Sequence, residues 1–578
     1  MAWDLVIRGG IVVDGTGLSR RRADVAVKDG RIAAVGHVPG AKDAERVIDA
    51  EGMIVAPGII DAHTHYDPQL TFDPYATSSC YHGVTTVLAG NCGFSIAPTR
   101  SDARPYIKAM FAKVEGMEPV ALDGVSWDFE SFPEYLAARE RSLGVNLACY
   151  IGHSSIRRFV MGADGSERHA TAAEVAEMRA LVREAMAAGA AGFSSSSVPT
   201  QVDGDDRPIP SRYSAREELV ALCEEAGLAG GGSISYLPKS VIGGLNEEDE
   251  ELLIELGQKS RLPIVIQGVG GRDKVDAPTA GWDNAKRFLD DAARRGAAIF
   301  SLLRNHPFDR PIDLDAGTPL YAGVFPWHAL MSLSHEEKRA KLNDPAVRDV
   351  LRTAVEHPNR DPDAGSTLPP PHWDVTFVDE VTDPRNEKYL RRTMAELAKE
   401  MGKAPADVMI DLALSEDLKM KFRWENKTPE WAKTVEECMK HPSMLMGVSD
   451  GGAHLDRDDG ADWSTYFLRA WVLDREVWTL EEGIRQLTQV PAAMAGFAGR
   501  GALLPGFAAD IMIFDPATVG PGTKRMVYDL PGGQGRFSAR PRGFAATIVN
   551  GEPIVLDGKL QTALPGQLVR PVGTEGRA

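Results

Sequence analysis

The sequence predicts an α/β fold, a (β/α)8 TIM-like barrel joined to a small β-sandwich domain built from both chain termini. Short strands separated by turn residues occur near both ends, and apolar strands alternate with helices between them. In addition, the segment Gly58-Ile-Ile-Asp-Ala-His-Thr-His65 places two histidines one residue apart after an apolar run. A chain of 578 residues is long enough for one large barrel and a second, smaller domain.

The two chain ends, residues 1–57 and 500–570, are predicted to form the β-sandwich domain. Short apolar strands such as Leu5-Val-Ile and Ala23-Asp-Val-Ala-Val lie between turn signals in the first segment. The same pattern returns in Ala509-Asp-Ile-Met-Ile-Phe and Ile554-Val-Leu-Asp-Gly-Lys. Because the same pattern occurs at both ends, we expect the two segments to build one sandwich.

Residues 58–499 are predicted to form the barrel. Three helix starts match a capping box, in which Ser or Thr and a Glu three residues later satisfy free backbone N–H groups: Thr171 with Glu174, Ser214 with Glu217, and Thr479 with Glu482. Apolar strands follow the first two helices, and further strands are expected at Leu262-Pro-Ile-Val-Ile-Gln and Ala298-Ile-Phe-Ser-Leu-Leu. Eight such units would close a barrel whose active site lies at the carboxyl ends of its strands.

The segment from about 304 to 388 interrupts this rhythm and is predicted to be an insertion, or lid, over the barrel mouth. It is rich in Pro, Asp, His and Trp, with one clear helix expected at 334–342. Its aromatic residues either line a binding pocket or anchor the lid to the barrel: Phe308, Phe325, Trp327 and Trp373.

Composition indicates a globular protein that binds a small molecule. The formal net charge of −18 disfavours nonspecific binding to nucleic acid or anionic membranes. No leader sequence or long apolar run is evident, so a cytoplasmic protein without a membrane span is expected. The five cysteines are few, odd in number and scattered, which indicates reduced thiols.

His63 and His65 are the strongest functional signal. On an extended strand, residues two apart point to the same side. Two neutral imidazoles converging on one point are typical of a divalent transition-metal site, most often zinc, although two unrelated histidines near a turn would show the same spacing. The pattern therefore indicates a metallohydrolase.

Several motifs along nearly the whole chain resemble those of the amidohydrolase superfamily, and specifically its N-acyl-D-amino-acid deacylase branch. They are Ala56-Pro-Gly-Ile-Ile-Asp-Ala-His-Thr-His, Gly83-Val-Thr-Thr-Val, Gly90-Asn-Cys-Gly-Phe-Ser-Ile-Ala-Pro, Gly152-His-Ser, Gly189-Ala-Ala-Gly-Phe-Ser, Gly447-Val-Ser-Asp-Gly, Gly506-Phe-Ala-Ala-Asp and Val549-Asn-Gly. The resemblance implies a metal-bearing barrel with a β-sandwich made from both chain ends.

By that resemblance, His63 and His65 bind a metal at the so-called α position, Cys92 is its thiolate ligand, and Asp450 is a ligand or proton shuttle. A thiolate is a strong zinc ligand, whereas a small buried cysteine beside a glycine turn is the alternative for Cys92. Asp450 follows an apolar run and precedes two glycines, which places it at a strand end or in a simple turn.

The sequence departs from the branch at two strands where a histidine is expected. Ser233, Ser235 or Gln267 occupy those places, and none is a good zinc ligand. Because these histidines complete the second metal position, one zinc ion is predicted and a second is doubtful. Three histidines in the expected loops could replace them as ligands, or could be ordinary loop residues: His306, His328 and His372.

Substrate contacts are predicted from residues beside these motifs. The set comprises His153, Gln267, His306, His454 and Arg457. Arg304 and Arg423 are further candidates for an anionic group, with Arg457 favoured by its position. His153 and His454 are also candidates for contacts that orient the metal ligands.

The predicted reaction is hydrolysis of an amide bond in a small, apolar or aromatic N-acyl or cyclic amide compound, through a zinc-activated water and Asp450 as general base and acid. Cleavage of an ester or lactone uses the same groups. The same residues are also compatible with a heterocycle deaminase, or with a noncatalytic relative that binds a small molecule. A homo-oligomer is possible for such a chain.

Overall fold

The computed structural model describes residues 3–40, 43–241, 244–269, 281–307, 309–315, 324–356, 372–425, 427–455 and 460–573. Within these ranges the chain divides into two compact units. The larger unit contains residues 3–269, 281–306 and 435–573, apart from the gaps named above, and the smaller unit contains the described part of 307–434.

The larger unit contains a curled sheet of eight parallel strands, which confirms the predicted barrel. In the order of the sheet, they are β6 (Ile59–Asp61), β7 (Val84–Ala89), β8 (Asn146–Gly152), β9 (Gly192–Ser196), β10 (Ser233–Leu237), β11 (Ile264–Gln267), β12 (Ile299–Leu303) and β16 (Met444–Met446). A parallel bridge between Thr64 and Gly451, just beyond β6 and β16, joins the first strand to the last. Almost every strand residue is buried, as expected where helices cover a parallel sheet.

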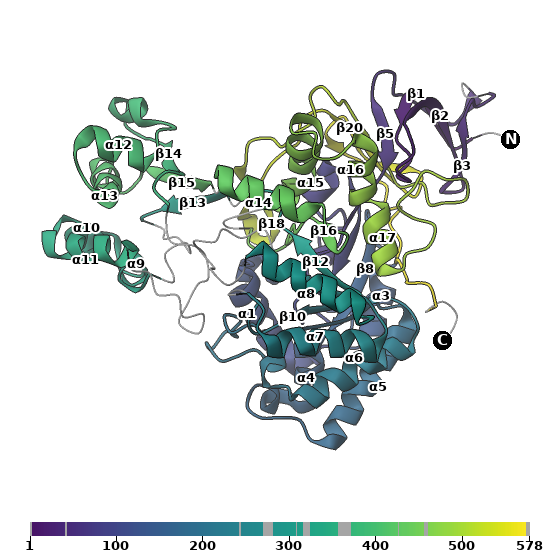
Figure 1. The fold of residues 1–578 in the computed structure, drawn as a ribbon, viewed down its shortest axis with the longest axis horizontal. Coiled ribbons are helices and arrows are strands. Elements are labelled where there is room, and N and C mark those ends of the chain that lie inside the picture. Colours follow the sequence, from purple (N-terminus) through teal and green to yellow (C-terminus); the bar gives the residue numbers. More distant parts are fainter. Residues whose placement is uncertain are drawn as a thin grey trace. The chain divides into compact units, whose positions relative to one another are not determined.

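Helices connect these strands, and Figure 1 shows α4 to α8 beside one another around the barrel strands. The helices of the larger unit are α1 (Arg104–Glu115), α2 (Pro119–Leu122), α3 (Phe132–Arg139), α4 (His153–Met161), α5 (Ala172–Ala188), α6 (Arg216–Leu228), α7 (Glu247–Ser260), α8 (Trp282–Arg294), α15 (Trp463–Tyr466), α16 (Leu480–Leu487) and α17 (Gln489–Ala495). In addition, α14 (Pro429–Met439) crosses the boundary between the units.

The predicted helix caps are correct in part. Thr171 and Glu174 form the full capping box of α5, and Thr479 accepts the Glu482 N–H at the start of α16. The prediction for Ser214 is wrong, because α6 begins one residue later, with Ala215 at the N-cap, and Ser214 Oγ donates to the Ser211 carbonyl instead. A 3-10 turn at Pro210–Tyr213 occupies the chain just before it.

Both chain ends contribute to one mixed sheet of nine strands, so the predicted β domain is present (Figure 1). Its strands are β1 (Leu5–Val12), β2 (Arg21–Lys28), β3 (Arg31–Gly36), β4 (Arg46–Asp49), β5 (Ile54–Pro57), β17 (Ile511–Phe514), β20 (Phe544–Val549), β21 (Glu552–Leu556) and β22 (Lys559–Leu560). The antiparallel pairing of β5 with β17 joins the two chain ends. Outside this sheet, β18 (Arg525–Leu530) and β19 (Gln534–Ser538) form a separate hairpin.

Asp510 links this sheet to the barrel. Its carboxylate accepts hydrogen bonds from Asn146 Nδ2 at the start of β8 and from the Asn550 N–H, and it pairs with Arg500. The motifs Gly506-Phe-Ala-Ala-Asp and Val549-Asn-Gly thus meet in space, and the hydrogen bond between Asp510 and Asn550 gives both motifs a structural role.

Replacing Asp510 by alanine is expected to lower the free energy of unfolding by about 3 kcal/mol, because it leaves the nearly buried Arg500 guanidinium without this partner. The change appears as a lower thermal midpoint. The matched control is Glu552→Ala, which breaks an exposed ion pair with Arg46 and should cost less than about 1 kcal/mol. Equal midpoints for the two variants would contradict this role of Asp510.

The smaller unit has its own sheet and core. It comprises the antiparallel strands β13 (Asp309–Asp313), β14 (Thr376–Glu380) and β15 (Lys421–Glu425) with helices α9 (Phe325–Met331), α10 (His335–Asn343), α11 (Pro345–Glu356), α12 (Met394–Met401) and α13 (Pro405–Ser415). The helix expected at 334–342 is α10, which Ser334 caps. Trp327 is fully buried in the core of this unit, where its Nε1 donates to the Leu351 carbonyl, so it does not line a pocket. Phe325 is 47% exposed, Trp373 packs against the same core, and Phe308 lies outside the described residues.

Among the described residues, none of the helices combines the length and the apolar character that crossing a membrane would require.

Candidate metal centre

The His63–His65 segment lies directly beyond β6 and is fixed by the loop after β16. The His65 N–H donates to the Gly451 carbonyl at 2.7 Å, and Ser449 Oγ donates to the His63 carbonyl at 3.1 Å. Asp61, the last residue of β6, accepts from Trp463 Nε1 at 3.1 Å. Burial raises the pKa of Asp61 to about 7, although hydrogen bonds from Ser449, Trp463 and the His63 N–H to its carboxylate oppose the shift.

Cys92 lies in a tight loop after β7. The Asn91 side chain donates to the carbonyls of Thr64 and Leu88, which ties the loop to the histidine segment. Gly90 has a φ of 73°, and a Cβ there would lie 2.3 Å from the Tyr150 carbonyl oxygen, so only glycine fits. Cys92 itself has a φ of 55°, a left-handed conformation that is costly for a residue with a side chain and often marks a functional site.

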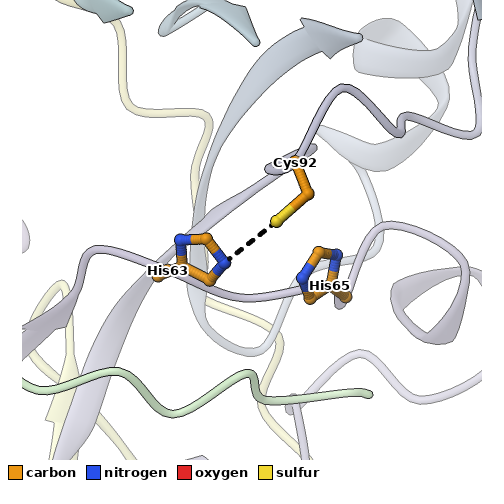
Figure 2. A group of neighbouring side chains, drawn as sticks. All are labelled: His63, His65 and Cys92. Atoms are coloured by element: carbon orange, nitrogen blue, oxygen red, sulfur yellow. Dashed lines mark hydrogen bonds between the residues drawn. The ribbon is translucent and has the colours of Figure 1, made fainter. Parts of the chain in front are cut away.

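His63, His65 and Cys92 converge at the carboxyl ends of the barrel strands. One donor atom from each lies within 4.8 Å of the others, and all three residues are buried. Figure 2 shows the Cys92 sulfur facing the two rings, with Sγ 3.5 Å from His63 Nε2. The ring centroids of His63 and His65 are 5.4 Å apart. The side chains that the sequence predicts to be ligands are thus brought together.

This donor set fits a zinc ion. From usual bond lengths, donors of a tetrahedral zinc site lie about 3.3 Å apart for two N or O atoms and about 3.5 Å apart for N and S. The Cys92–His63 separation of 3.5 Å matches the second value. Within the described part of the chain, the buried Nδ1 atoms of His63 and His65 have no hydrogen-bond partner. Because Nε2 is the His63 nitrogen that faces Cys92 and Asp450, an ion bound there would leave its Nδ1 atom as it is.

The electrostatic environment keeps the two imidazoles neutral. Burial lowers the pKa of His65 to about 3 and also lowers that of His63, so both lone pairs are free at neutral pH. Burial raises the pKa of the Cys92 thiol well above its usual range, and the carboxylates of Glu115 and Asp450 add to this effect. A metal ion that binds the Cys92 thiolate must therefore displace a proton.

Asp450 lies beside this group, in the loop after β16. Its Oδ1 is 3.3 Å from His63 Nε2, and it accepts a hydrogen bond from Gln267 Nε2 at 3.3 Å. Burial alone would raise the pKa of Asp450, but His63, His454, His65 and Arg304 outweigh it and hold the pKa below the usual value of 3.8. The Asp450 side chain is 20% exposed, whereas that of His63 is 2% exposed, so Asp450 is the more accessible of the two to solvent.

Glu115 also belongs to this group, although no pattern in the sequence singles it out. It is the last residue of α1, its side chain is 4% exposed, and its Oε2 is 3.6 Å from His65 Nε2. A glutamate at the end of an amphipathic helix normally reads as a surface residue. Only its burial beside His65 distinguishes it.

Some of the other predicted residues lie beside this group, and the rest lie elsewhere in the protein. His454 Nε2 is 4.0 Å from Glu115 Oε2, and Arg304 acts on the pKa of Asp450. His306 is buried after β12. Arg457 lies outside the described residues. Three candidates lie in the smaller unit: His328, His372 and Arg423, the last paired with Asp379.

His153 is held in a buried network instead of facing the metal centre. Its Nδ1 lies 2.8 Å from Ser195 Oγ and its Nε2 lies 2.8 Å from Glu218 Oε1, while Arg157 pairs with the same carboxylate. His153 and Arg157 are fully buried. Both ring nitrogens are therefore occupied, which favours a structural role over a substrate contact.

Replacing Glu218 by alanine is expected to lower the free energy of unfolding by roughly 3 kcal/mol or more, because it leaves the buried Arg157 guanidinium without its carboxylate. Metal content should stay unchanged. Thermal unfolding and elemental analysis measure the two effects, with Glu217→Ala as the exposed neighbouring control. Loss of metal from the Glu218 variant would show instead that this network belongs to the metal centre.

Ser233 and Ser235 are buried on β10, where the sequence lacks one of the histidines, and Ser233 Oγ hydrogen-bonds to Tyr150. Gln267, at the place of the other, bonds to Asp450. An open depression of about 300 Å³, most of it open solvent, lies beyond the ends of β10 and β11. Its apolar lining includes Val241, Leu245, Val269, Ala285 and Phe288.

Comparisons with known proteins agree with this architecture. A family model described as "Amidohydrolase family" matches residues 46–555. The chain is 29% identical to the D-aminoacylase of Alcaligenes xylosoxydans xylosoxydans over 559 residues, which cover 96% of this chain and 94% of that protein. It is 26% identical to the N-acyl-D-glutamate deacylase of the same organism, with coverage of 95% and 93%.

A solved structure has the same fold over nearly the full length. It is that of N-acyl-D-glutamate deacylase from Bordetella bronchiseptica complexed with zinc and a phosphonate inhibitor, with a TM-score of 0.63, 24% identity and coverage of 99% of this chain and 100% of that one. A D-aminoacylase crystal structure gives a TM-score of 0.62 at 24% identity. The chain therefore belongs to the amidohydrolase family.

Proposed function

We propose that this metal-dependent amidohydrolase cleaves the amide bond of a small N-acyl or cyclic amide compound that carries an apolar or aromatic group. The observation that carries the proposal is the convergence of His63, His65 and Cys92 within 4.8 Å, with Asp450 3.3 Å from His63. Two imidazoles, a thiolate and a partly exposed carboxylate suit hydrolysis assisted by one divalent ion.

His63, His65 and Cys92 would hold a zinc ion, which when bound polarises a carbonyl and makes a water molecule more acidic. The Asp450 carboxylate accepts a proton from the attacking water as its oxygen bonds to the carbonyl carbon. Asp450 then returns that proton to the nitrogen as the carbon–nitrogen bond breaks, which leaves a carboxylic acid and an amine. Gln267 holds Oδ1 of this carboxylate in place.

The depression beyond β10 and β11 supports an apolar group on the substrate. Val269 lines this depression and lies two residues after Gln267, which hydrogen-bonds to Asp450. A few ångströms of backbone therefore separate the lining from the residue that holds Asp450. The apolar side chains of this lining favour an alkyl or aromatic group by removing its surface from water, and Glu250 and Asn284 in the same lining offer polar contacts.

A substrate panel tests this function. Zinc-loaded enzyme is given N-acyl derivatives of D- and L-leucine and D- and L-phenylalanine, cyclic amides and aromatic lactones, and released amine or acid is measured. We expect turnover of an amide with an apolar or aromatic group. Turnover of lactones alone would replace the proposal with an esterase, and no turnover of any of them by the loaded enzyme would contradict it.

A further inference from the structure

One buried serine closes the loop that carries Cys92. Ser194, on β9, donates from Oγ to the Gly90 carbonyl at 2.5 Å and accepts the Gly93 N–H at 3.1 Å. Gly90 lies two residues before Cys92, and Gly93 follows it directly. The loop continues from β7, which β8 separates from β9 in the sheet. A single hydroxyl group thus ties the backbone on both sides of Cys92 to a strand that is not adjacent to its own.

Gly93 lets the loop lie directly against β9. It has a φ of 78°, and a Cβ there would lie 3.1 Å from Ser195 Cα, which is closer than nearly all such contacts. Its carbonyl accepts the Ser154 N–H at 3.0 Å, near the start of α4. Both backbone polar groups of Gly93 are therefore held by the barrel, and this fixes where Cys92 lies relative to β9.

The backbone of Cys92 depends on such support. Its φ of 55° is a left-handed conformation, which a residue with a side chain keeps only where the surrounding structure enforces it. Asn91 connects the loop to the Thr64 carbonyl, on the side of the two histidines, whereas Ser194 connects it to β9. Ser194 is fully buried, so bulk solvent does not reach its hydroxyl group.

We propose that Ser194 is a positioning residue of the metal centre, which holds the Cys92 sulfur in place through the backbone of the loop. The sulfur faces the rings of His63 and His65 in Figure 2, and this direction follows from the loop conformation. Because the folded loop has already ordered this donor, an ion that binds it does not have to pay that entropy. The inference rests on the proposed function, since it requires that Cys92 binds the ion.

The test is the affinity of the full-length protein for zinc. Metal-free wild type and Ser194→Ala are titrated with Zn²⁺ in competition with a chromophoric chelator, below the thermal midpoint of both proteins. Alanine removes both hydrogen bonds and leaves the Gly90 carbonyl and the Gly93 N–H without this partner. We expect the zinc affinity to fall by about 10- to 100-fold, the usual effect of losing a contact that orients a metal ligand.

The matched control is Ser196→Ala, which makes the same change on the same strand. Ser196 is also fully buried, but its hydroxyl group accepts the Val198 N–H at 3.3 Å, outside the Cys92 loop. This variant should bind zinc as tightly as the wild type. Ser194→Thr keeps the hydroxyl group and should bind zinc more tightly than Ser194→Ala.

Cobalt gives a second readout, which a general loss of stability would not change. In the cobalt-loaded protein, the thiolate-to-cobalt absorption band of Cys92 should shift or weaken in Ser194→Ala, because the sulfur is no longer held in one position. The band should stay unchanged in Ser196→Ala.

Two results would overturn the inference and leave the proposed function intact. One is equal zinc affinity, with an unchanged cobalt band, in the wild type and Ser194→Ala. The other is an equal loss of affinity in Ser194→Ala and Ser196→Ala, because the loss would then come from the packing of β9. A wild type that binds cobalt without a thiolate band, or binds no ion, would overturn the proposed function as well.

Discussion

Cys92→Ala is expected to lose the bound zinc and to lower kcat/KM by about a thousandfold or more. In the proposed centre Cys92 would supply the thiolate donor, and its Sγ is 3.5 Å from His63 Nε2. A bound ion contributes several kcal/mol to stabilising the transition state, and each factor of ten in rate corresponds to about 1.4 kcal/mol. Elemental analysis of purified protein, together with hydrolysis of the best amide substrate, measures both effects.

The control for this variant is Cys223→Ala, a cysteine equally buried in α6 and outside the metal group. Both changes remove a buried sulfur, so they share any loss of packing. Only Cys92→Ala should lose metal. A Cys92 variant that keeps both its zinc and its activity would mean that the sulfur is merely a small buried group beside a glycine turn, and the hydrolase would need another ligand.

Asp450→Asn is expected to lower kcat by about a hundredfold to ten-thousandfold, the usual contribution of a general base, while zinc stays bound. Asparagine keeps the shape of the side chain but has no carboxylate to accept a proton. The three donors His63, His65 and Cys92 are unchanged. Steady-state kinetics and metal content, measured on the same sample, separate a catalytic loss from a loss of the ion.

A graded control is Gln267→Ala, which removes one hydrogen bond to Asp450 Oδ1 and should cost about tenfold or less. The pH profile provides a further check. Because the pKa of Asp450 lies below 3.8, its carboxylate is ionised through the neutral range, and its protonation should limit the rate only below that pH. Full activity of Asp450→Asn with zinc bound would assign proton transfer to another group.

Local sequence patterns predicted several elements correctly. The Thr171 capping box starts α5, the helix expected at 334–342 is present as α10, and apolar runs mark the barrel strands. The predictions that were wrong depend on packing. Ser214 does not cap α6 because a preceding turn uses its side chain, and Trp327, in the insertion, packs into the core of its own unit.

The sequence by itself predicted from their spacing that His63 and His65 point toward one place, although they lie just beyond β6 and not on the strand itself. The resemblance of its motifs to the N-acyl-D-amino-acid deacylases also placed Cys92 and Asp450 near them, and a strand end is where the apolar run before Asp450 places its carboxylate. Only the tertiary structure brought in Glu115 and His454 and tied Gln267 to Asp450. Glu115 ends a helix 50 residues after His65, and no periodicity links a helix end to a loop more than 300 residues further on. Their approach depends on how the helix and loop pack, which local spacing does not encode.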